Sequence, residues 1–81
     1  MNCSNICIAV LGSNTKRIYS NAFANCTNLR EVFISLNTKS ISKNAFNNCN
    51  KLVIYSTKNS YAQEYSDYQG IPFVAIHKLP H

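Results

Sequence analysis

A nearly identical stretch occurs twice in this chain of 81 residues, 23 positions apart. The first copy is residues 21–29, NAFANCTNL, and the second is residues 44–52, NAFNNCNKL. When residues 2–29 are compared with residues 25–52, 13 of the 28 positions are identical, against about two for unrelated stretches of average composition. A period between about 20 and 50 residues indicates a repeat architecture in which one coil stacks on the next. The chain is therefore predicted to be a solenoid.

The chain is predicted to be one small domain, residues 1–81, which consists of repeats followed by an irregular C-terminal part. A chain this short buries only about 60% of the surface that it exposes when unfolded, so each coil depends on its neighbours for stability. The match begins within a repeat, and we expect the chain to be the C-terminal part of a longer array. The predicted parts are repeats at 2–24, 25–47 and 48–58, a C-terminal cap at 59–76 and a tail at 77–81.

Alternating apolar positions predict one short strand in each unit. In the second unit Val32 and Ile34 are apolar and share one face of a strand, with Phe33 between them on the other face. Phe23 and Phe46 occupy the same place in successive units, where a bulky ring fills the core of a stacked solenoid. The predicted fold is an α/β solenoid of short parallel strands and short helical or 3₁₀ turns, closed by a C-terminal helix and strand.

The segment after the last repeat breaks the period and predicts a helix over residues 60–70. Ser60 and Gln63 have the spacing of a capping box, Gly70 is a C-terminal stop signal, and Pro72 prevents continuation. Three tyrosines at i, i+4 and i+7 follow one face of this helix: Tyr61, Tyr65 and Tyr68. An apolar, β-prone stretch at residues 71–76 is expected to add the last strand.

The repeated pattern Ile-x-x-x-Ala-Phe-x-x-Cys-x-x-Leu, at residues 18–29 and 41–52, closely resembles the BspA-like leucine-rich repeats, whose period is also 23. The end of the chain, from Leu52 through the tyrosine-containing helix to residues 71–73, is similar to the segment that often closes such arrays. One departure is that the usual Ile-Pro after the strand is replaced by Leu-Gly at 11–12 and Ile-Ser at 34–35. The resemblance covers residues 2–76.

This resemblance implies a non-enzymatic protein-protein interaction module of a cell-surface, adhesin-like protein. The implied partner is a host matrix protein or another cell-surface protein, together with upstream repeats of the same chain. The implied location is the cell surface or the extracellular space, and the family has no shared catalytic residues and no cofactor. The alternative is a purely structural C-terminal cap of a longer array, with the binding surface upstream.

The strand face is the expected binding surface, because a solenoid presents one outward side chain per coil at each strand position. The outward residues of the second unit are predicted to be Glu31, Phe33 and Ser35. Val10 precedes Phe33 by one period, and Tyr55 is expected to extend the same apolar stripe. The candidate protein-binding residues are therefore Val10, Glu31, Phe33, Ser35 and Tyr55. Two alternatives to a binding role remain open: the stripe is covered by an oligomer of the chain itself, or the alignment of apolar residues is fortuitous.

Cys3, Cys26 and Cys49 are one period apart and are expected to be reduced, buried core residues. Side chains in phase on adjacent coils lie near 5 Å apart, so a disulfide between two of them also stays geometrically open. Cys7 is off this ladder.

Other chemistry is not expected. Pairs spaced like zinc ligands occur at residues 3–7 and 77–81, but a solenoid keeps the two ends of the chain apart, so no metal site is predicted. The histidines are terminal and no carboxylate pair is available for catalysis. The net charge of +5 is scattered, which argues against nucleic acid. The longest apolar run, residues 6–11, is far shorter than the 18 or so residues of a membrane span.

Overall fold

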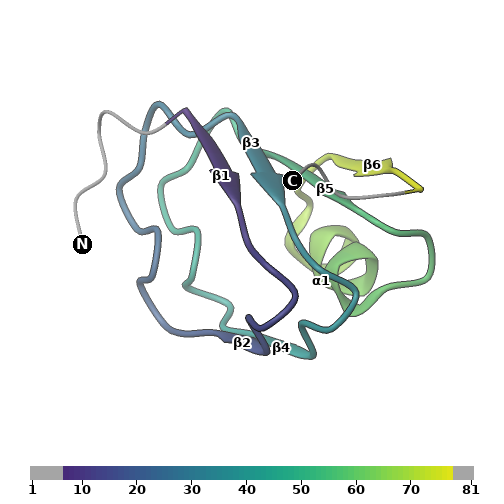
Figure 1. Ribbon diagram of the computed structural model, residues 1–81. Helices are drawn as coiled ribbons and strands as arrows, with labels where there is room; N and C mark the ends of the chain where they lie inside the picture. The colour runs from purple at the N-terminus through teal and green to yellow at the C-terminus, as the bar shows by residue number, and fades with distance from the viewer. Residues whose placement is uncertain (1–6, 78–81) are drawn as a thin grey trace.

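The computed structural model describes residues 7–77, and in this part the chain winds through stacked coils with a helix at one end (Figure 1). The elements in chain order are β1 (Ile8–Val10), β2 (Arg17–Ile18), β3 (Glu31–Phe33), β4 (Ser40–Ile41), β5 (Val53–Ser56), α1 (Tyr61–Gln69) and β6 (Phe73–Ala75). One sheet has the order β1-β3-β5-β6 and the other pairs β2 with β4. Every strand pair is parallel. The predicted parallel-strand solenoid is confirmed.

The strand register follows the sequence period between the first two coils and departs from it at the third. Ala9 pairs with Val32, the residue one full period later. Val32 in turn pairs with Ile54, which is one residue short of a full period away. The two leucines that precede these strands, Leu29 and Leu52, are still one full period apart, so the third coil lacks one residue just before β5. Pairing within the sheet, rather than the count along the chain, determines which side chains of β5 face inward.

The core consists of ladders of equivalent side chains. Val32, Ile34 and Ile54 are fully buried behind the four-stranded sheet. Across the core, the rings of Phe23 and Phe46 stack with centroids 5.4 Å apart and an interplanar angle of 5°. Such pairs contribute about 0.5–1.5 kcal/mol beyond the area that they bury, so the predicted aromatic ladder adds to the cohesion between coils.

Polar side-chain hydrogen bonds also join equivalent positions of adjacent coils. Asn25 and Asn48 both have a left-handed backbone, with φ of 64° and 65°, a conformation that Asn tolerates better than most residues. The side-chain amide of Asn48 donates to the side-chain oxygen of Asn25 at 2.7 Å. In the same way the hydroxyl of Thr38 donates to the carbonyl of Thr15 at 2.6 Å. The asparagine before each cysteine therefore adopts the left-handed backbone of the turn and also forms a hydrogen bond between adjacent coils.

The expected helical or 3₁₀ segments are turns with i+3→i hydrogen bonds. The N–H of Ala45 donates to the carbonyl of Ser42 at 3.0 Å, and the N–H of Cys49 donates to that of Phe46 at 3.1 Å. These bonds have the 3₁₀ pattern, which is used in short pieces because its geometry is poorer than that of an α-helix. They let the chain cross the far side of the core within one coil.

The C-terminal helix α1 has the predicted start and stop. The hydroxyl of Ser60 accepts from the N–H of Gln63 at 3.3 Å. Gln63 reaches back one residue further than in a standard capping box, since its side-chain oxygen accepts from the N–H of Asn59 at 2.6 Å. Gly70 ends the helix with φ of 73°, and its N–H bonds to the carbonyl of Ser66. Beyond it, β6 pairs with β5 and completes the sheet.

Candidate functional site

The outward face of the four-stranded sheet carries a row of apolar side chains. The register aligns Val10 with Phe33, Phe33 with Tyr55, and Tyr55 with Val74. The two valines at the ends are 48% and 42% exposed, and the two aromatic residues between them are half-buried. This apolar row, defined as Val10, Phe33, Tyr55 and Val74, crosses all four strands. The structure thus brings together three of the predicted site residues: Val10, Phe33 and Tyr55.

The centre of the apolar row is a stacked aromatic pair. The ring centroids of Phe33 and Tyr55 are 4.7 Å apart, with an interplanar angle of 22°. Each ring covers one side of the other, which explains why both are half-buried although they lie on the outward face of the sheet. The pair is therefore a stacked aromatic platform whose remaining surface faces outward.

A second row runs parallel to the first, two residues earlier in each strand. Ile8 aligns with Glu31, and Glu31 aligns with Val53. Ile8 is 57% exposed. Beside Ile8 and Glu31, a hollow of about 250 Å³ is also lined by Cys7 and Arg30. Glu31, the fourth predicted site residue on the face, therefore places a carboxylate next to the apolar row.

Ser35 is not on this face, and its predicted outward orientation was wrong. Strand β3 ends at Phe33, and both Ile34 and Ser35 are buried, with Ser35 only 4% exposed. The hydroxyl of Ser35 accepts from the N–H of Asn37 at 3.0 Å. The chain turns inward here, so the two-residue alternation of a strand no longer applies.

Three residues of the face were not among the predicted site residues: Ile8, Val53 and Val74. The alternation of β1 already placed Ile8 outward, two residues before Val10. Val53 and Val74 depend on the register of β5 and β6, where the third coil is one residue short. An alignment of Val32 with Ile54 that allows this deletion is the sequence signal that would have found Val53.

The cysteine ladder belongs to the scaffold in the described part of the chain. Cys26 is buried, whereas Cys49 is half-buried and its thiol donates to the carbonyl of Phe23 at 3.0 Å. Cys7 is exposed at the edge of the sheet. Cys3, the third predicted member of the ladder, lies outside the described residues. The ladder positions therefore contribute packing and coil-to-coil contacts.

Two further properties of residues 7–77 concern metal binding and membranes. Within this range, no group of three or more His, Cys, Asp and Glu side chains is arranged to hold a metal ion. The described helix is not long and apolar enough to cross a membrane. Of the residues spaced like zinc ligands, His77 is exposed, whereas Cys3 and His81 lie outside the described residues.

Parallel strands, a regular sequence repeat and stacked ladders define a leucine-rich-repeat solenoid. A comparison with protein-family models matches residues 1–68 to the BspA type Leucine rich repeat region (6 copies). The chain belongs to this family. Leucine-rich repeat domains are generally protein-binding modules and are typically not catalytic. Comparisons with curated proteins and with solved structures gave no match.

Proposed function

We propose that this module binds a protein ligand through the outward face of the four-stranded sheet, as part of an adhesin-like protein at the cell surface. The observation that carries the proposal is the apolar row, which crosses all four strands and leaves the side chains of Val10 and Val74 nearly half exposed. Contiguous exposed apolar surface of this kind is typical of protein interaction sites.

The chemistry of the face favours a protein partner. Aromatic residues are enriched at the centres of protein interfaces, where they account for much of the binding energy. Phe33 and Tyr55 occupy the central strands of the sheet, with valines on both sides and the Glu31 carboxylate beside them. The face is preorganised, because backbone bonds such as Ile34 N–H to the Tyr55 carbonyl, 2.9 Å, hold the strands in place.

Adhesion and a surface location are supported by the family rather than by a single residue. Families of BspA-type repeats are commonly associated with cell surfaces. An extended, rigid and partly apolar face suits a matrix protein or another surface protein as the ligand. Catalysis is not part of the proposal.

A second candidate role is that of a structural cap, which α1 and β6 support. Both elements pack against β5, at the opposite edge of the sheet from β1. They cover that end of the core, as terminal units of solenoids must. In this role the binding surface would lie in upstream repeats of the array.

The proposal is tested by replacing Phe33 with Ser and measuring binding to a panel of immobilised extracellular-matrix proteins. The expected result is a loss of affinity of tenfold or more, with a fall of only a few degrees in the thermal unfolding midpoint, because the ring lies on the outward face and its main loss within the fold is the stack on Tyr55. Leu36→Ser is the matched control, since Leu36 is 51% exposed but follows β3 rather than facing outward from it. Equal loss in both variants, or no loss in Phe33→Ser, would contradict the strand face as the site.

A further inference from the structure

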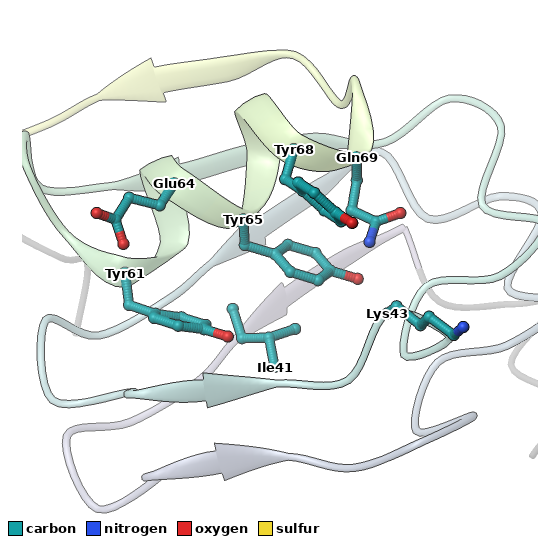
Figure 2. Close-up of a pocket in the computed structure, with 7 residues that line it drawn as sticks. All are labelled: Ile41, Lys43, Tyr61, Glu64, Tyr65, Tyr68 and Gln69. Carbon is teal, nitrogen blue, oxygen red and sulfur yellow. The ribbon is translucent and has the colours of Figure 1, made fainter.

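A groove of about 330 Å³ lies between α1 and the segment around β4, on surface that shares no residue with the strand face (Figure 2). Its walls come from two parts of the chain that β5 separates in sequence, Ile41 and Lys43 on one side and the helix on the other. Grooves of roughly 300 Å³ or more, with an apolar lining and a few convergent polar groups, are typical of ligand sites.

Three tyrosines of one helix face form the apolar part of the groove. Tyr61, Tyr65 and Tyr68 all line it, and Figure 2 shows their side chains projecting from the same side of α1. Tyr68 is 87% exposed. At a rise of 1.5 Å per residue, the helix spaces the first and last of these residues by about 10.5 Å along its axis. The groove is thus a short aromatic track.

Tyr65 lies at the base of this track and is fixed in place. Its hydroxyl donates to the carbonyl of Ser42 at 2.9 Å, and its ring meets the edge of Phe46 with centroids 6.2 Å apart. A site whose groups are already held in position loses less conformational entropy on binding than a flexible one. The aromatic track is therefore preorganised by the solenoid beneath it.

Polar side chains at both ends of the groove have no partner in the described part of the chain. Lys43 and Gln69 lie near the C-terminal end of α1 and Glu64 lies near its start (Figure 2). Neither the hydrogen bonds nor the ion pairs of residues 7–77 involve these three side chains. The phenol hydroxyls of Tyr61 and Tyr68 also lack a partner there. The ammonium, the phenols and the amide nitrogen of these side chains can all donate, and the carboxylate, the phenols and the amide oxygen can accept.

We infer that this groove binds a proline-rich peptide segment in the polyproline II conformation. Such a segment repeats every three residues, about 9.3 Å at a rise of 3.1 Å per residue, which is close to the length of the aromatic track. Its carbonyls form no internal hydrogen bonds and need donors from the site, which the groove supplies. Its pyrrolidine rings pack against aromatic side chains, and its preformed helix costs little entropy on binding.

The charges at the two ends give the segment a direction. The Glu64 carboxylate favours a basic residue next to one end of the proline-rich stretch, and the Lys43 ammonium favours an acidic residue next to the other.

The test is a calorimetric titration of the whole chain with a synthetic decaproline that carries one arginine at an end. A glycine–serine peptide of the same length and charge is the ligand control. Tyr68→Ser is expected to weaken binding of the proline peptide at least tenfold. Tyr19→Ser is the matched control, because Tyr19 is 68% exposed and lies outside the groove, and it should leave binding unchanged. Both tyrosines are exposed, so both variants should keep the wild-type unfolding midpoint.

Other outcomes separate this inference from competing ones. Equal binding of the glycine–serine peptide, or binding of the proline peptide that Tyr68→Ser leaves intact, overturns it. Saturable binding of an oligosaccharide that Tyr68→Ser abolishes, without binding of the proline peptide, also overturns it in favour of a sugar site. Glu64→Gln should remove the preference for an arginine-flanked over an aspartate-flanked peptide. Phe33→Ser should leave the proline peptide bound, so this result is independent of the strand face.

Discussion

The repeated coils and the C-terminal cap are held together by similar contacts that use different residues. In the coils, Phe23 stacks on Phe46 with rings nearly parallel. In the cap, Tyr65 takes the next place beside Phe46, but its ring meets Phe46 at an interplanar angle of 60°. Its hydroxyl also bonds to the carbonyl of Ser42, one full period earlier in the chain. The aromatic ladder thus continues into a segment that lacks the repeat pattern.

The same contrast appears in the bonds between coils. Thr38 donates from its hydroxyl to a backbone carbonyl one coil earlier, that of Thr15. Ser56 at the end of β5 donates from its hydroxyl to the carbonyl of Ile34, also one coil earlier. A stacked core requires a particular contact at a particular place in the coil, and more than one residue type satisfies it. The segment from β5 to β6 keeps such contacts without keeping the repeat pattern.

The largest expected effect is at Phe46, the residue that joins the two regions. Phe46→Ala removes the ring between Phe23 and Tyr65 and should lower the free energy of unfolding by about 3–5 kcal/mol. That loss is most of the stability of a small domain. Urea denaturation followed by circular dichroism measures it. Phe23→Ala is the control, since Phe23 is less buried and should cost less; an equal or larger loss there would place the centre of the ladder in the coils instead.

A smaller effect is expected at Asn48, which represents the coils. Asn48→Ala places an alanine at φ of 65° and removes the bond to Asn25, so it should cost about 1–2 kcal/mol. Asn48→Gly also loses the side-chain bond but tolerates the left-handed backbone, and it should be distinctly more stable than Asn48→Ala. The same urea denaturation compares the two variants. If they are equally stable, the amide ladder rather than the backbone conformation explains the asparagine.

The smallest effect is expected at Tyr65, which represents the cap. Tyr65→Phe turns the cap residue into the residue used by the coils and removes the hydroxyl bond to Ser42. The expected cost is about 0.5–1.5 kcal/mol at neutral pH. A variant at least as stable as the wild type would mean that the aromatic contact alone holds the cap.

The pH dependence of the Tyr65 contribution sharpens this test. Burial raises the pKa of the Tyr65 phenol from 10.0 to about 12, and Tyr61 and Cys49 add to the rise. The folded-state pKa is higher than the unfolded one, so the neutral phenol stabilises the fold fully below pH 10 and loses that contribution as the pH rises through 12. The stability advantage of the wild type over Tyr65→Phe should therefore shrink in this window. Absorbance of tyrosinate during alkaline titration follows the ionisation.

Much of the fold could be predicted because the sequence contains two copies of the same pattern of core residues. Each inward position recurs after one full period, so the positions of Val32 and Phe46 in the core followed from the comparison of two copies. The helix signals at Ser60 and Gly70 are local and needed no copy. Where one copy had to be extrapolated, the result was less complete. The outward position of Tyr55 was expected, whereas Val74 was not among the predicted residues.

The candidate site was harder to predict than the scaffold, because its members meet only across the sheet. Ser35 was assigned to the face by continuing the alternation of β3, but the strand ends before it, at Phe33, and the chain turns inward. Strand ends depend on packing and on bonds such as the one from the Asn37 N–H to Ser35. A pattern with a period of two residues contains no information on where it stops.

The amino-acid sequence by itself determined the solenoid, its parallel pairing and the residues of its ladders, because a periodic pattern places equivalent side chains at the same angle in every coil. The tertiary structure decided the shifted register of β5, the extension of the apolar row to Val74, and the groove beside Tyr68. Val74 and the groove depend on β6 and α1, which have no equivalent in another repeat, and the register of β5 depends on pairing with β3 across a one-residue deletion. In the segment after the repeats, packing against the preceding coil determines where α1 and β6 lie.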